Sequence, residues 1–88
     1  MPYINKSHRF YNLSGLCTQL SELSDEDFSA NLNYVISYIV RSCLSRKGVR
    51  YKYINAVIGT LQCVMLELYR IVAAPYEDTK IEENGDIL

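Results

Sequence analysis

The stretch that decides the fold is residues 51–74, with the sequence YKYINAVIGTLQCVMLELYRIVAA. Its apolar residues recur three and four positions apart, as they do along one side of an α-helix. This front stripe consists of Ile54, Val57, Ile58, Leu61, Val64, Met65, Leu68, Ile71 and Val72. The spacing predicts one long amphipathic helix over residues 51–74.

The opposite side of this helix is not cleanly polar, since at about 100° per residue it carries a second set of small and apolar residues. This back stripe consists of Ala56, Gly59, Cys63 and Leu66. A glycine inside a helix costs about 1 kcal/mol relative to alanine, and small side chains let a second helix approach closely. Either this helix is central in a bundle, or the back stripe is an interface with another subunit; the alternative is a single tolerated glycine.

The chain before this stretch predicts two more helices. Residues 1–6 are expected to form an extended arm, and Ser7 is a plausible N-cap for a helix over residues 8–23. A second apolar stripe predicts a helix over residues 31–46. The acidic residues 24–27 between them suit either a turn or the first turn of a helix, whose dipole favours negative charge there.

The ends of the helices also have sequence signals. Gly48, after two basic residues, is typical of a helix C-terminus, and the short connection predicts an antiparallel hairpin with the long helix. Pro75 is expected to end or kink the long helix and to begin a short helix over residues 75–83. Residues 84–88 are expected to form a tail.

Bulk composition points to one all-α globular domain over residues 1–88, a small helical bundle. The 88 residues are 49% apolar and 22% charged, with a net charge of −1 that gives no global attraction to nucleic acid or membrane. No run of 18 apolar residues is present, so no membrane-spanning helix is expected. No signal-peptide core is visible at the N-terminus, which predicts a cytoplasmic location.

The sequence carries no recognisable catalytic or metal-binding motif. It has no glycine-rich phosphate loop, no HExxH and no nucleophile elbow, so no catalytic residue is assigned and an enzyme is not expected. Cys17, Cys43 and Cys63 are irregularly spaced, and His8 is the only histidine. We therefore expect no metal and no cofactor, and interpret the cysteines as reduced, buried small hydrophobes.

Two groups of side chains are candidates for ligand binding. The first, called the basic turn, interleaves cations and aromatic rings at a helix start and consists of Arg46, Lys47, Arg50, Tyr51, Lys52 and Tyr53. Such a group could hold an anionic ligand, because arginine binds phosphate and tyrosine stacks on bases; the alternative is a solvated helix cap. The second group is Tyr69, Arg70 and Tyr76, where Arg70 could line a pocket or instead pair with Glu77 or Asp78.

Charge is segregated along the chain although the total nearly cancels. Residues 41–52 contain five basic residues and no acid, whereas residues 77–88 contain five acids and one lysine. In an oligomer the basic segment of one subunit could meet the acidic segment of another. A chain this short buries little surface by itself, so a homo-oligomer is expected.

Several motifs together resemble a known family of small proteins. They are the series LNY at 32–34, YINAVIG at 53–59, LELYR at 66–70, APYED at 74–78, KI at 80–81 and ENGD at 83–86. They resemble proteins of tailed bacteriophages, prophages and bacteria that carry a domain of unknown function, with the match over residues 32–88. The resemblance implies a phage or prophage origin, a host-cell cytoplasmic setting and an accessory role directed at host functions.

These observations leave three functional hypotheses. The first is a homo-oligomeric, non-enzymatic binder of an anionic ligand, in its sharpest form one that sequesters a nucleotide signal of bacterial immunity. The second is a protein–protein module that docks a host or phage protein through the long helix and residues 75–86. The third is nucleic-acid binding through the basic turn, against which the net charge and the missing recognition motif both count.

Overall fold

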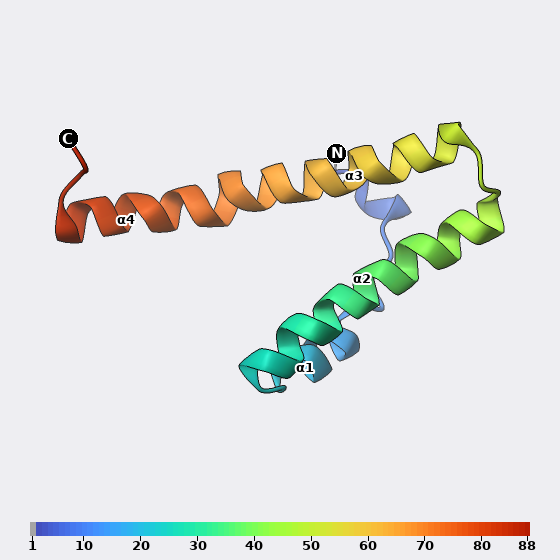
Figure 1. The fold of residues 1–88 in the computed structure, drawn as a ribbon, viewed down its shortest axis with the longest axis horizontal. Coiled ribbons are helices and arrows are strands. Elements are labelled where there is room, and N and C mark those ends of the chain that lie inside the picture. Colours follow the sequence, from blue (N-terminus) through green and yellow to red (C-terminus); the bar gives the residue numbers. More distant parts are fainter. Residues whose placement is uncertain (1) are drawn as a thin grey trace. The chain divides into compact units, whose positions relative to one another are not determined.

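The computed structural model describes residues 2–88, and within them the chain is helical without any strand (Figure 1). The all-α prediction is confirmed. In chain order the elements are a 3₁₀ turn η1 (Lys6–His8), α1 (Ser14–Ser21), α2 (Asp25–Lys47), α3 (Tyr51–Leu68), a π-helical turn η2 (Tyr69–Ala73) and α4 (Ala74–Asn84). The described chain divides into two compact units, Tyr3–Val57 and Ile58–Leu88 with Pro2, and the boundary between them lies inside α3. The bundle and the hairpin stay predictions.

The first predicted helix starts later than expected. Asn5, not Ser7, is the cap: its Oδ1 accepts hydrogen bonds from the backbone N–H of Ser7 at 3.0 Å and from the Ser7 hydroxyl at 2.9 Å. The turn stops at His8, and α1 begins only at Ser14. Such side-chain bonds offer the backbone an alternative to the helix. Of the predicted arm over residues 1–6, Met1 lies outside the described residues.

Helix α2 begins at Asp25, so the predicted start at residue 31 is wrong by six residues. Ser24 caps it, its hydroxyl accepting from the backbone N–H of Asp27 at 3.4 Å, and three acids occupy the first turn. The acidic segment therefore belongs to the helix, where it faces the positive end of the dipole. The predicted C-terminus is confirmed at Gly48, whose φ of 114° favours glycine. Helix α1 packs against α2 (Figure 1).

The long helix starts at Tyr51 as predicted, but it does not end at residue 74. A single helix of 34 residues runs over Tyr51–Asn84, and the predicted separate helix over residues 75–83 is its continuation. Pro75 lacks the N–H that a regular turn needs, and the chain adopts a π turn just before it. There the Ala74 N–H donates to the Tyr69 carbonyl, five residues back. Gly85, with a φ of 87°, terminates the helix as predicted.

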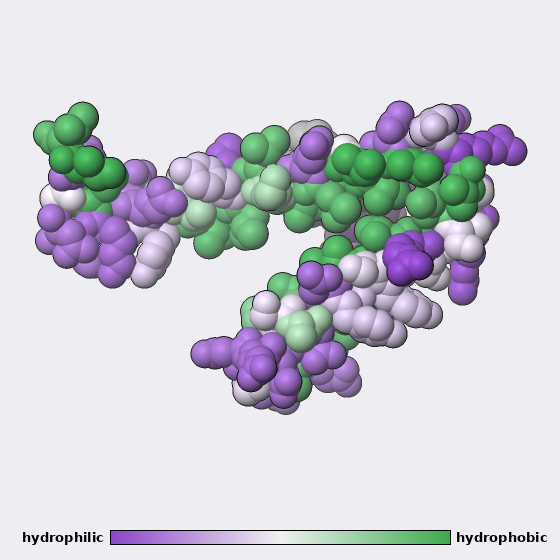
Figure 2. Space-filling view, viewed as in Figure 1, coloured by the Kyte–Doolittle hydropathy of each residue, from purple (hydrophilic) through white to green (hydrophobic). Residues whose placement is uncertain are grey.

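None of residues 2–88 is buried, which decides how the apolar stripes must be interpreted. Apart from Pro2, the described part of the unit Ile58–Leu88 consists of one helical rod and the tail, so it has no second helix of its own to cover that rod. Apolar atoms gather along α3 in Figure 2. The three cysteines are exposed, so their predicted burial is wrong, because the units enclose no core that could hold them.

Candidate binding surfaces

The basic turn joins the end of α2 to the start of α3, all within the unit Tyr3–Val57. Gly48 closes α2 by donating its N–H to the Leu44 carbonyl at 2.9 Å. The Arg50 carbonyl then accepts from the N–H groups of Tyr53 at 3.0 Å and Ile54 at 2.9 Å, which sets the first turn of α3. Arg46 and Lys47 thus end one helix while Tyr51, Lys52 and Tyr53 begin the next.

Tyr53 is the centre of this group. The Nζ of Lys47 lies 5.4 Å from the centre of its ring and the Nζ of Lys52 lies 5.6 Å from it, both within cation–π range. The Tyr53 ring therefore contacts cations from both helices and stabilises the connection. By contrast, Tyr51 is 83% exposed and offers a free ring face to a ligand. Of the six predicted residues, the structure brings Lys47, Lys52 and Tyr53 into contact, and Tyr53 has a structural role.

The second predicted group lies at the π turn and on α4, in the unit Ile58–Leu88. Arg70 forms an ion pair with Glu67, three residues back. The group that reaches forward past Pro75 is the Tyr69 hydroxyl, which donates to Glu77 Oε2 at 3.5 Å. The π turn thus places Tyr69 beside an acid of α4, while Arg70 pairs with Glu67 of α3.

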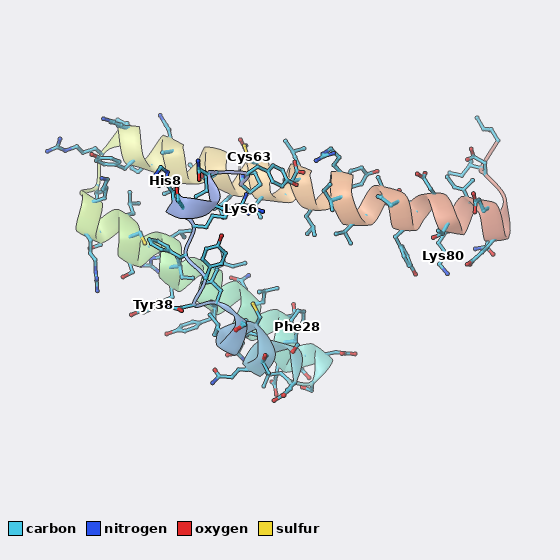
Figure 3. The ribbon with its side chains drawn as sticks, turned by 180° about the vertical axis from the view of Figure 1, so that it is seen from behind. Lys6, His8, Phe28, Tyr38, Cys63 and Lys80 are labelled. Carbon is cyan, nitrogen blue, oxygen red and sulfur yellow. The ribbon has the colours of Figure 1, made fainter. Side chains whose placement is uncertain are left out.

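Tyr76 is held by its own helix. The Nζ of Lys80 lies 5.5 Å from the centre of the Tyr76 ring and also pairs with Glu83 Oε2 at 3.2 Å. Figure 3 labels Lys80 on the C-terminal part of the rod. Tyr69 and Tyr76 each make local contacts, and these contacts order the surface of α4.

The back stripe lies on one face of α3, as its spacing predicted. Cys63 and Leu66 are exposed and Gly59 is half-exposed. A methyl group built on Gly59 would meet nothing within 4 Å. The chain's own described residues therefore do not require glycine at this position, so the use of Gly59 as a close-approach point depends on a neighbour from outside them.

A group that the sequence analysis missed lies on α2. Tyr34 and Tyr38 place their rings 6.2 Å apart beside Arg41, on the side of α2 opposite its apolar residues. The signal was available, because positions 34, 37, 38 and 41 follow helical spacing. The prediction of a helix over residues 31–46 used only the apolar stripe on the other side of the same helix.

Two broader properties bear on the kind of site. Among residues 2–88, no three His, Cys, Asp or Glu side chains gather as metal ligands would. By length and composition alone, the helix Tyr51–Asn84 could cross a membrane. The lack of 18 uninterrupted apolar residues therefore does not exclude such a helix, and its expected absence stays a prediction. A helix surrounded by protein in an assembly has the same properties.

Comparison with known proteins gives one result that bears on identity. Neither the curated proteins nor the solved structures contain a match to this chain. A family described as Domain of unknown function (DUF6899) matches residues 1–87, and thus also the first 31 residues that the resemblance did not include. Because the match covers nearly the whole chain, this protein belongs to the DUF6899 family.

Proposed function

We propose that this protein is a non-enzymatic binding protein that works as a homo-oligomer and holds an anionic ligand. The observation that carries the proposal is α3, whose front and back stripes are both exposed in a chain without a buried residue among residues 2–88. A helix that is apolar on opposite sides is typical of the interior of a larger assembly.

The exposed front stripe forgoes a large amount of hydrophobic stabilisation. Seven front-stripe residues of the unit Ile58–Leu88 are between 39% and 64% exposed: Ile58, Leu61, Val64, Met65, Leu68, Ile71 and Val72. Full burial of such a side chain is worth about 1.5–3 kcal/mol. Leaving about half of each exposed forgoes roughly 7 kcal/mol along the stripe, which is comparable to the whole stability of a small domain. Other helices should therefore cover it.

The two stripes also constrain the kind of assembly. One packed helix covers one face of α3, so covering both faces takes neighbours on two sides. The segregated charge supports contacts between subunits, because the acidic residues of α4 could face the basic residues 41–52 of another copy. These features support an oligomer in which helices of other copies pack on α3.

For the ligand, the basic turn is the first candidate. Its cations and the exposed Tyr51 ring suit a phosphate joined to a planar base. The resemblance to phage and prophage proteins supports the sharper version, in which the oligomer sequesters a nucleotide signal of bacterial immunity in the cytoplasm of the host.

Calorimetry with a panel of cyclic nucleotides and ADP-ribose derivatives tests the ligand. Stoichiometric binding by the intact oligomer, weakened at least tenfold by Arg50→Glu, is the expected result, since the substitution reverses the charge at the centre of the basic turn. A folded oligomer that binds no member of the panel would remove the nucleotide proposal and leave self-association standing.

A second candidate is a protein–protein module that docks a host or phage protein. The exposed front stripe favours it, because an unrelated partner could cover that surface as well as a second copy could. Recovery of one stoichiometric partner on immobilised protein, unaffected by Arg50→Glu but lost with Leu61→Asp, would favour this function. If the partner were lost with Arg50→Glu and kept with Leu61→Asp, the docking surface would not be α3.

A further inference from the structure

A groove on α2 stands apart from the basic turn. Its volume is about 390 Å³, and it is lined by Tyr34, Ser37, Tyr38, Arg41 and Ser42. All five lie on one side of one helix in the unit Tyr3–Val57, so the helix alone fixes their register. The groove is open to solvent, so a ligand there would lie against one side of the helix.

Two aromatic rings form one part of this groove. The rings of Tyr34 and Tyr38 are 6.2 Å apart and inclined by 32°, and the two residues are 65% and 61% exposed. In Figure 3, Tyr38 projects from α2. Rings this far apart and this open keep faces available, and every nucleobase can stack on such a face.

A positive charge lies one turn further along α2. Within residues 2–88, no hydrogen bond or ion pair occupies the guanidinium of Arg41. Arg41 also begins the segment of residues 41–52 that contains five basic residues and no acid. Residues three apart on a helix are neighbours, with Cβ atoms about 5–6 Å from each other. Arg41 can therefore reach an anionic group on a ligand whose ring lies on Tyr38.

Hydroxyl groups complete the lining. The Ser37 hydroxyl donates to Asn33 Oδ1 at 3.1 Å, which leaves its oxygen lone pairs as acceptors. Ser42 is half-exposed and its hydroxyl has no hydrogen-bond partner within residues 2–88.

We propose that this groove binds a small ligand in which an aromatic ring is joined to a phosphate. The ring lies on Tyr34 and Tyr38, and the phosphate accepts from Arg41. The inference rests on the proposed function for the class of ligand, an anionic nucleotide, and adds a site that is separate from the basic turn.

The test is calorimetry of the full-length protein with three probes: adenosine 5′-monophosphate, adenosine, and inorganic phosphate. The monophosphate should bind at least tenfold tighter than either fragment. Arg41→Gln should weaken it at least tenfold without changing adenosine binding, because only the charge is removed. Tyr38→Leu should weaken both at least tenfold, whereas Tyr38→Phe, which keeps the ring, should stay within threefold of the native protein.

Circular dichroism and sedimentation should be unchanged in these variants, because the replaced side chains are exposed. Equal binding of the monophosphate and inorganic phosphate, or no effect of Arg41→Gln and Tyr38→Leu, would overturn the groove. If Arg50→Gln removes monophosphate binding and Arg41→Gln does not, the groove is overturned and the proposed function stands. If only the cyclic-nucleotide panel binds, the groove is likewise overturned and the proposed function stands. If neither set of probes binds, both the groove and the proposed function are overturned.

Discussion

At the scale of single residues, the chain uses glycine where its backbone turns. Gly48 and Gly85 have φ values of 114° and 87°, and each follows the last residue of a helix. Within residues 2–88, no residue other than glycine has a positive φ. The two helix ends were predictable because a local signal decides them. Glycine has no Cβ, and it follows a helix whose final carbonyls need a hydrogen-bond donor.

Replacing Gly48 by alanine should destabilise the protein by about 1 kcal/mol or more, because a side chain is strained at this φ. Gly15→Ala is the matched control. Gly15 lies inside α1 with nothing within 4 Å of a new methyl group, so it should gain about 0.5–1 kcal/mol. Urea unfolding of both variants at one protein concentration measures the difference. Equal effects at the two positions would refute the left-handed cap.

Comparing Tyr53 with Tyr51 separates the structural role of the basic turn from its proposed ligand binding. Tyr53→Leu should lower the free energy of unfolding by about 1–2 kcal/mol, since it removes two cation–π contacts of about 0.5–1 kcal/mol each. Tyr51→Leu, at an exposed ring without such contacts, should change stability by less than about 0.5 kcal/mol. Thermal and urea unfolding check both. A larger loss of stability for Tyr51→Leu than for Tyr53→Leu would mean that Tyr51, not Tyr53, stabilises the connection.

At the scale of elements, the π turn explains why the long helix survives a proline. Periodicity predicted the helix and its first residue, because both are local properties of residues 51–74. Periodicity did not predict the continuation to Asn84. Proline normally breaks a helix, and no residue near Pro75 signals a π turn. The early start of α2 was missed for a similar reason: Ser24 and the acids after it fit a turn and a helix start equally well.

Pro75→Ala should convert the π turn into regular α-helix, because the new N–H at position 75 can donate four residues back. Stability should rise, by less than about 3 kcal/mol because the π turn already absorbs part of the cost of proline. A π turn contains one residue more than an α-helical turn. Its conversion into α-helix rotates α4 by about 100° relative to α3 and separates Tyr69 from Glu77.

Hydrogen-bond scalar couplings by NMR measure the partner of the Ala74 N–H, which should change from Tyr69 to Arg70. Unfolding by urea measures the stability in the same samples. A variant that is less stable than the native protein, or that keeps the bond to Tyr69, would show that proline is not the cause of the π turn.

At the scale of the whole molecule, periodicity predicted the apolar stripes of α3, whereas the groove on α2 was not predicted. The stripes on α3 follow from periodicity, and their exposure agrees with the absence of any buried residue within residues 2–88. The groove at Tyr34 and Arg41 was not predicted, because an arginine's lack of a carboxylate partner is a property of three-dimensional placement. The cysteines were misjudged for the same reason: burial depends on a core that these units do not contain.

Gly59→Gln tests the back stripe as an interface. A longer side chain there meets nothing in the described chain but would obstruct a close helix from another subunit, so self-association should weaken at least tenfold. Gly15→Gln, the same change on α1, should leave self-association unchanged. Sedimentation equilibrium measures both dissociation constants. Equal constants for the two variants would remove Gly59 from the interface.

The most direct test of homo-oligomerisation is the molar mass of the native protein in detergent-free buffer, by sedimentation velocity across a range of concentrations. The account predicts a single species of at least twice the 10.1 kDa chain mass, because the exposed apolar stripes of α3 need helices of another copy to cover them. A cooperatively folded 10.1 kDa monomer at every concentration, or a protein that leaves solution for lipid vesicles, would contradict it.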